Sequence, residues 1–307
     1  MDRSLGFLRM RNATQRTRTM GLLLTFAVVA ACHRTSETSR TDFRIPPFSE
    51  SEEVRMTDVP NEDGFRRIVI RQSGNYLEGI LDKHQREIIP PLADLLVHEI
   101  EGDLALVQFG RKFLFIPLGD EAVSREELEE VAGFQYATPY RCELALVVLD
   151  DRWFYIRRDG QRAFHEDFDF AEPFHFDRAL VKVGSRYRIL DTHGETVANL
   201  PYDQVNSQSP WCWQATNVEG GKFLSGFVDL NGQLLTDLVY EEVGTYDPQT
   251  KRIRVAQKDR YGFLDEYAKV AIPLIYEYAE VFDHGKARVE LRGRDFFIDP
   301  NGVELTE

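Results

Sequence analysis

The chain has 307 residues, with 37 Lys and Arg against 51 Asp and Glu, and a formal net charge of −14 at pH 7. So acidic a chain repels nucleic acid and anionic lipid surfaces, and no basic stripe offsets that charge. Its length suffices for one sizeable core or for a continuous array of repeats.

Residues 1–31 are typical of a secretory leader. Five Arg residues precede an uncharged apolar run at 21–31, which is too short for the roughly 20 residues of a membrane span. The run ends in Val29-Ala30-Ala31-Cys32, and small residues directly before a cysteine resemble the bacterial lipobox. That resemblance implies cleavage before Cys32, a diacylglyceryl group on its sulfur and N-acylation. The alternative is a plain signal peptide with an incidental cysteine.

A lipid on Cys32 would anchor the protein to a membrane without spanning it, because two or three acyl chains hold a domain far more firmly than one. His33 rather than Asp follows the cysteine, which by analogy favours the outer membrane of a bacterial envelope. Residues 1–31 carry five Arg and one Asp, so their removal takes the net charge from −14 to −18. Residues 32–61 are polar and indicate a flexible tether.

An internal repeat fills residues 62–307. Seven times, an apolar dipeptide precedes an anchor position and a turn, at intervals of 35, 40, 34, 38, 36 and 34 residues. The anchors are Asp82, Pro117, Arg157, Asp191, Asp229, Asp265 and Asp299. Twelve residues after the anchor stand Asp94, Glu129, Asp169, Asp203, Glu241 and Glu277, each followed two positions later by an apolar residue. Self-similarity at a fixed period indicates a repeat architecture.

Each repeat predicts three strands. Strand A is the apolar run that opens twelve residues before the anchor, strand B passes through the anchor, and strand C follows a turn glycine. Gly232 and Gly302 are each preceded by Asn, and Asn-Gly suits a tight hairpin turn. A helix is predicted only from Ser124 to Val131, where a charged insertion lengthens the second interval.

The repeated acid has two interpretations. A carboxylate at the same place in every repeat could line a cation site, which would make a Ca²⁺-stabilised array. An Asp or Glu next to a turn more often accepts backbone N–H bonds and fixes that turn. We favour the structural interpretation, because catalysis normally uses one special pair of carboxylates rather than six equivalent ones.

Few residues outside the repeat pattern suggest chemistry. Cys142 and Cys212 are expected to be buried thiols, although an oxidising envelope would permit a disulfide. No metal site and no cofactor are predicted: the histidines lack zinc spacing, and His165 and His175 with the acids between them indicate a surface loop. Trp211 and Trp213 alternate along an expected strand, so both could stack on a ligand such as a sugar; filling of the core is the favoured interpretation.

The anchor motifs resemble the bacterial WG repeat, whose copies read aromatic-Gly-aromatic-aliphatic-Asp, a turn, Ile-Pro and Tyr-Asp. The best copy is Tyr261-Gly262-Phe263-Leu264-Asp265 with Ile272-Pro273 and Tyr276-Glu277, and further copies start at Gly79 and Gly226. The motif glycine is replaced by Leu114, Phe154, Arg188 and Phe296 in the other four. The resemblance implies an envelope or secreted protein and supplies no catalytic residues.

Together these patterns predict an all-β array of seven three-stranded antiparallel repeat units of about 36 residues, each packing on its neighbours. An open, solenoid-like array is favoured over a closed seven-bladed propeller, because the array begins with strand A and ends with strand C, leaving no strand to close a ring.

The predicted function is that of a non-enzymatic, lipid-anchored binding or scaffold module for an envelope protein or glycan. The alternative is a carbohydrate-active enzyme with two facing carboxyl groups. For that enzyme, an acid outside the repeat pattern, such as Glu166 or Asp167, would have to converge with Trp211 and Trp213.

Overall fold

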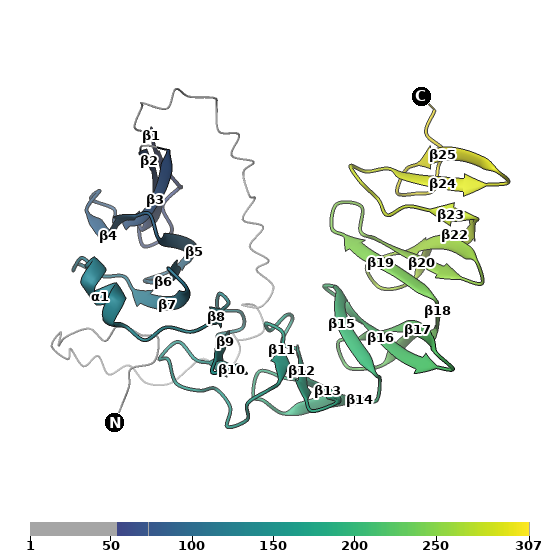
Figure 1. Cartoon of the computed structure of the whole chain (residues 1–307), viewed down its shortest axis with the longest axis horizontal. Helices are drawn as coiled ribbons and strands as arrows, with labels where there is room; N and C mark the ends of the chain where they lie inside the picture. Colours follow the sequence, from purple (N-terminus) through teal and green to yellow (C-terminus); the bar gives the residue numbers. More distant parts are fainter. Residues whose placement is uncertain (1–53, 73, 307) are drawn as a thin grey trace, which may run out of the picture. The chain divides into compact units, whose positions relative to one another are not determined.

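The computed structural model describes residues 54–72 and 74–306, so the leader 1–31, Cys32 and the tether up to residue 53 lie outside the described residues. Over the described residues the chain forms seven antiparallel sheets of three or four strands and one short helix (Figure 1). The prediction of an all-β chain of seven antiparallel repeats is confirmed, and the preference for an open array stays a prediction. The chain divides into an N-terminal unit up to Asp177 and a C-terminal unit from Arg178 onward.

The N-terminal unit holds three sheets, in the strand orders β1-β2-β3-β4, β5-β6-β7 and β10-β9-β8. Its elements are β1 (Val54–Thr57), β2 (Arg66–Gln72), β3 (Asn75–Leu81), β4 (Glu87–Leu92), β5 (Leu95–Glu101), β6 (Leu104–Phe109), β7 (Lys112–Pro117), α1 (Arg125–Glu130), β8 (Tyr136–Ala137), β9 (Ala145–Leu149), β10 (Arg152–Ile156) and β11 (Phe170–Ala171).

The C-terminal unit continues with β12-β13-β14, then β15-β16-β17-β18, β19-β20-β21-β22 and β23-β24-β25. The bounds are β12 (Ala179–Val183), β13 (Arg186–Leu190), β14 (Thr196–Leu200), β15 (Gln204–Ser209), β16 (Cys212–Glu219), β17 (Lys222–Asp229), β18 (Leu234–Tyr240), β19 (Glu242–Asp247), β20 (Arg252–Gln257), β21 (Arg260–Leu264), β22 (Val270–Tyr276), β23 (Tyr278–Ala279), β24 (Ala287–Leu291) and β25 (Arg294–Ile298).

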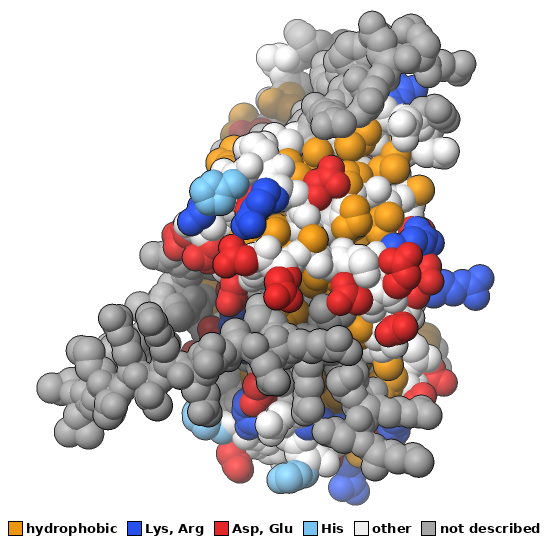
Figure 2. Space-filling view, turned by 90° about the vertical axis from the view of Figure 1, so that its left-hand side faces the viewer, with side chains coloured by type: hydrophobic (Ala, Val, Ile, Leu, Met, Phe, Trp, Pro, Cys, Tyr) orange, Lys and Arg blue, Asp and Glu red, His pale blue; other side chains and the backbone are white. Residues whose placement is uncertain are grey.

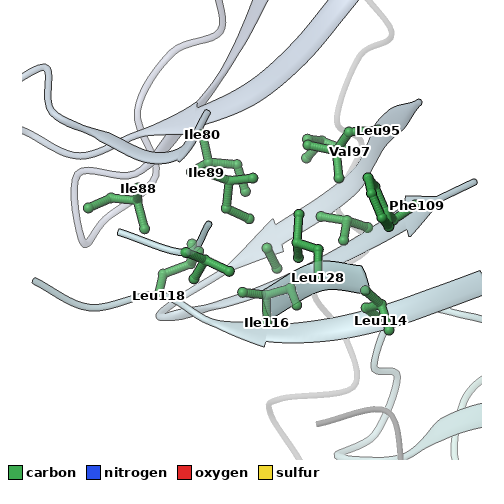
Figure 3. Packing of buried hydrophobic residues seen from close by; sticks show 13 residues of the cluster. Ile80, Ile88, Ile89, Leu95, Val97, Phe109, Leu114, Ile116, Leu118 and Leu128 are labelled. Atoms are coloured by element: carbon green, nitrogen blue, oxygen red, sulfur yellow. The ribbon is translucent and has the colours of Figure 1, made fainter. Parts of the chain in front are cut away.

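The hydrophobic cores lie between neighbouring sheets. In the first core, Ile80 and Ile89 of the first sheet face Leu95 and Ile116 of the second, with Leu128 of α1 beside them (Figure 3). The C-terminal unit has the same arrangement, in which one core joins β13 and β14 to β16 and β17 and the next joins β17 to β20 and β21. A single sheet therefore buries its apolar face only against its neighbours, as repeat arrays do.

A further strand was missed in every repeat. With the exception of Val131, which caps α1, the apolar residue two positions after the acid lies in a segment that pairs with strand A. Val205 of β15 pairs with Ala215 of β16, and Ala279 of β23 pairs with Val289 of β24. The expectation of three strands is therefore wrong for sheets such as β15-β16-β17-β18. Several of the missed strands, including β8, β11 and β23, are two residues long, too short to show a period.

The first sheet begins earlier than predicted. β1 lies inside the range 32–61 that was predicted to be a flexible tether, and it pairs with β2 from Val54–Arg71 to Thr57–Ile68. The tether boundary at residue 61 is therefore wrong at its C-terminal end. β1 also precedes strand A of the first repeat. The preference for an open array assumed that no extra strand exists at this end, and that assumption is wrong.

The predicted helix is present at α1. Ser124 is its N-cap, accepts from the Glu127 N–H and receives the Glu127 carboxylate on its own N–H, which forms a reciprocal capping box. Val131 is the C-cap. Leu128 is fully buried, so the insertion contributes an apolar residue to the first core in place of a strand C.

The motif glycine lies where strand C crosses strand B. A Cβ at Gly79 would lie 2.6 Å from the Ile89 carbonyl oxygen, and one at Gly226 would lie 2.6 Å from that of Asp237. Leu114, Phe154 and Phe296 stand at this position in β7, β10 and β25, whose sheets have no strand C. Arg188 pairs with Asn199 of β14 in regular register. A larger residue therefore replaces the motif glycine where strand C is absent or pairs with strand B in regular register.

Candidate functional site

The anchor aspartates fix the turns that shape the candidate site. The Asp229 carboxylate accepts the N–H groups of Asn231 and Gln233 at 2.9 and 2.8 Å. The Asp265 carboxylate accepts those of Tyr267 and Lys269 at 2.9 Å each. The same pair of bonds occurs at Asp82, Asp191 and Asp299. These carboxylates therefore have a structural role as side-chain acceptors in tight turns.

Two of these turns enclose an open pocket of about 350 Å³ in the C-terminal unit. Its lining comes from the β17–β18 turn, from the β21–β22 turn and from Trp211 of the β15–β16 connection. The lining residues are Trp211, Asp229, Leu230, Asn231, Leu235, Tyr267 and Lys269. The pocket thus combines two aromatic rings with a carboxylate, an amide and an ammonium group.

The two tryptophans that were predicted as possible ligand contacts lie in different environments. Trp213 is 4% exposed and packs between the sheets with Ile189, Leu200 and Val228. The possible ligand contact of Trp213 is therefore wrong, and the favoured interpretation of core filling holds for it. Trp211 precedes β16 and is partly exposed; its ring lies 5.6 Å from that of Tyr267, at 34°. The rings of Trp211 and Trp213 do not share one face of a strand as predicted, because Trp211 lies in the turn before β16.

A polar cluster holds the chain segment that carries Trp211. The Ser209 hydroxyl donates to the Glu266 carbonyl at 2.6 Å and accepts the Trp211 N–H at 3.1 Å. The Glu266 carboxylate accepts from Lys251 at 3.1 Å and from the Tyr246 hydroxyl at 3.4 Å. Burial, reinforced by the Glu266 charge, raises the pKa of Tyr246 to about 12. These bonds hold the connection before β16 in place, and with it the Trp211 ring.

The segment that contains the β21–β22 turn matches a known sequence family. Residues 261–294 match the family model described as the WG containing repeat. This protein contains a WG repeat. The matched segment runs from β21 to β25 and includes Gly262, the Asp265 turn and Tyr267, so one wall of the pocket belongs to the WG repeat. No curated protein sequence matches the chain.

Solved structures that resemble the chain are remote in sequence. They include a eukaryotic initiation factor, with a TM-score of 0.40, 8% identity and coverage of 84% of this chain and 89% of that one. Hsv2 of Kluyvelomyces marxianus has a TM-score of 0.35 at 9% identity, with coverage of 80% and 92%. A protein of unknown function from Bacteroides caccae has a TM-score of 0.28 at 14% identity, with coverage of 69% and 93%. Similarity at this level transfers no function.

The acid between successive repeats also stabilises turns. The carboxylates of Asp203 and Glu241 accept the N–H groups of Val218 and Lys258 at 2.8 Å each, and that of Glu277 accepts the Gly293 N–H at 3.1 Å. In each case the donor lies in or next to the hairpin between strands A and B. The structural interpretation is correct for these three acids.

The second repeat needs a different register. Ala137 of β8 pairs with Val147 of β9, so Gln135 stands two residues before the paired apolar residue Ala137. Its side-chain oxygen accepts the Asp151 N–H at 3.0 Å. The assignment of Glu129 to the repeated acid is therefore wrong. Glu129 lies in α1 and pairs with Arg125 at 2.9 Å; the helix had shifted the register of the sequence pattern.

The cysteines and histidines form no site over the described residues. Cys212 is buried, as expected, whereas Cys142 is partly exposed, so the expectation of a buried thiol is wrong for Cys142. Burial raises the pKa of Cys212. Its thiol is therefore neutral at physiological pH. His165 and His175 are both exposed, and no group of three His, Cys, Asp or Glu residues in this part of the chain is arranged to hold a metal ion.

The carboxylates considered for catalysis belong to another unit. Glu166 and Asp167 lie in the N-terminal unit, whereas Trp211 and Trp213 lie in the C-terminal unit. Asp167 forms an ion pair with Arg162. The Trp211 pocket itself is lined by one carboxylate, that of Asp229. None of the helices within 54–72 and 74–306 is long and apolar enough to cross a membrane.

Proposed function

We propose that this WG-repeat protein is a non-enzymatic binding module of a bacterial envelope, anchored through a lipid on Cys32, which holds a protein or glycan partner. The observation that carries the proposal is the open pocket of Trp211 and Tyr267. Its two rings offer apolar surface, and Asp229, Asn231 and Lys269 add hydrogen-bond acceptors and donors to the lining. Pockets that combine aromatic rings with a few placed polar groups are typical of ligand sites.

The negative surface charge disfavours some classes of binding partner. The chain carries a net charge of −14, and acidic side chains gather in a band beside apolar ones on the face shown in Figure 2. Electrostatic repulsion therefore disfavours nucleic acids and other strongly anionic partners. Neutral glycans and neutral or basic proteins carry no such penalty.

Binding is favoured over hydrolysis by the chemistry of the pocket. Glycoside hydrolysis uses two carboxyl groups on either side of the scissile bond, and Asp229 is the single carboxylate in the pocket lining. Its Oδ1 already accepts two turn N–H groups. A carboxylate whose oxygen already fixes a turn is poorly placed to act as a general acid.

The pocket is tested by comparing the protein with its Trp211→Ala variant on an array of envelope glycans and in a pull-down from envelope extract. We expect a stoichiometric partner for the protein and at least a tenfold loss of affinity for the variant. Tyr76→Ala, which truncates an exposed aromatic of the N-terminal unit, is the matched control. A partner that binds both variants equally well would remove the pocket from the proposal.

Attachment to the membrane is tested separately. Expression of the full chain in a bacterium with labelled fatty acid should label the protein, and Cys32→Ser should abolish the label. An unlabelled protein that is recovered in soluble form would contradict the anchor without affecting the pocket.

A further inference from the structure

Five aromatic rings form an unbroken stripe in the N-terminal unit. The ring centroids of His98 and Phe113 are 5.3 Å apart, those of Phe113 and Tyr136 are 5.7 Å apart, and those of Tyr136 and Trp153 are 5.8 Å apart. Phe170 continues the stripe at 5.6 Å from Trp153. Each ring therefore touches the next one, at a nearly constant spacing.

The stripe is built from equivalent positions of successive sheets. Phe113 of β7 and Trp153 of β10 each stand four residues before their anchors, and Tyr136 of β8 and Phe170 of β11 open the strands that were missed in the sequence. The backbone bridges Phe113–Phe134 and Trp153–Phe168 join the last strand of one repeat to the segment that begins the next. The sheet scaffold therefore fixes the ring spacing.

The rings lie at the surface. Tyr136 is 42% exposed and Phe170 37% exposed; His98 is exposed, and Phe113 and Trp153 are partly exposed. In contrast, the neighbouring rings of Phe134, Phe154 and Phe168 are buried in the cores. A contiguous apolar surface of this kind is uncommon on a protein without a partner.

Charged groups along the stripe are engaged within the protein. Arg152 pairs with Asp169, Asp151 accepts from the Gln135 side chain at 3.2 Å, and the Lys112 ammonium donates to the Glu129 and Val131 carbonyls at 2.9 and 2.7 Å. The stripe thus presents aromatic surface in which neighbouring rings from Phe113 to Phe170 are inclined by 55–64°. Neutral polar groups lie beside it, such as the Gln108 amide next to His98. Its electrostatic complement is an uncharged ligand with an apolar face and many hydroxyl groups.

We propose that the stripe binds an extended, neutral polysaccharide, whose successive sugar rings stack on His98, Phe113, Tyr136, Trp153 and Phe170. Sugar rings expose C–H groups on their faces and hydroxyls at their edges, so they fit aromatic rings that have polar neighbours. An extended β-1,4-linked chain places its rings in a line, as the stripe requires, whereas an α-1,4-linked chain coils. The proposal rests on the glycan arm of the proposed function but uses a different surface from the Trp211 pocket.

The test is a titration of the protein with cellohexaose, mannohexaose and maltohexaose, followed by calorimetry and by tryptophan fluorescence. We expect saturable binding of an extended hexasaccharide, little binding of maltohexaose, and at least a tenfold loss of affinity in Tyr136→Ala/Phe170→Ala. Tyr76→Ala, which truncates an exposed aromatic outside the stripe, should bind as the unchanged protein does.

A second measurement needs no variant. Hydroxyl-radical footprinting of the unchanged protein should show protection of Tyr136, Trp153 and Phe170 by the bound hexasaccharide, with Tyr76 unprotected. Binding that survives the double variant, or that is lost in Trp211→Ala alone, would overturn the stripe and leave the pocket of the proposed function standing. Failure of all three hexasaccharides, or protection of the stripe by a proline-rich peptide instead, would also overturn it.

Discussion

A side chain at Gly262 would place its Cβ 2.7 Å from the carbonyl oxygen of Ile272, on the neighbouring strand. The pairing of β21 with β22 shifts register between Tyr261 and Phe263, which brings the backbone of β22 over Gly262. The glycine of the WG repeat is therefore a steric requirement of a strand crossing rather than a residue that contacts a ligand.

The close approach of β22 to Gly262 predicts that adding one methyl group there destabilises the protein. Gly262→Ala should destabilise the protein by about 1–3 kcal/mol, because the clash involves backbone that cannot move without breaking the sheet. Chemical denaturation measures this free energy of unfolding. Gly220→Asn is the control, since Gly220 has φ +58 with open space around it and Asn tolerates that conformation. Equal stability of Gly262→Ala and the unchanged protein would contradict the steric role.

Local signals in the sequence predicted much of this fold. The anchor aspartates and the glycines that follow them specify turns through contacts within five residues, so their positions could be read directly. The fourth strand depends on pairing with residues farther along the chain, as Ala137 pairs with Val147. The α1 insertion also moved Glu129 into the place of Gln135 in the pattern. Pairing across an insertion is not visible in a linear register.

The candidate site was only partly predictable for the same reason. Trp211 was predicted as a possible ligand contact, but its neighbours Tyr267 and Asn231 come from two other turns. The aromatic stripe did leave a signal, because Phe113 and Trp153 share one register position. Tyr136 and Phe170 complete it only through strands that the sequence pattern had not shown.

The two tryptophans should separate stability from binding. Trp213→Ala should cost about 3–5 kcal/mol of unfolding free energy, because it empties a closely packed position between two sheets. Trp211→Ala should cost about 1 kcal/mol or less, since its ring is partly exposed. Thermal or denaturant unfolding of both variants measures the difference. The reverse order of stabilities would show that Trp211, not Trp213, fills the core.

The N-cap of α1 should contribute measurably to the free energy of unfolding. Ser124→Ala removes the acceptor for the Glu127 N–H and should destabilise the protein by about 1 kcal/mol. Ser124→Asp retains an acceptor and serves as the matched control. If the two variants unfold together, the capping box is not what holds α1 against the first core.

The turn aspartates predict a loss of stability in acid. The Val303 N–H bond, opposed by partial burial and aided by the Asn301 bonds, lowers the pKa of Asp299 below 3.8. Because the folded pKa is the lower one, the stabilisation is complete above 3.8 and is lost as the pH falls through the folded value.

Asp299→Asn should therefore be less stable than the unchanged protein at neutral pH, and the two melting temperatures should converge as the pH falls below 3.8. Asp259→Asn, in the exposed β20–β21 turn, is the control and should not show this convergence. A constant difference for Asp299→Asn at every pH would exclude the carboxylate charge as the cause.

Binding without hydrolysis is tested most directly by incubating the purified protein with a neutral polysaccharide while both the retained glycan and newly formed reducing ends are measured. A binding module should retain the polysaccharide saturably, with no reducing ends above those of the glycan alone. Reducing ends that increase with time and with protein concentration would show that the protein consumes its ligand and is an enzyme.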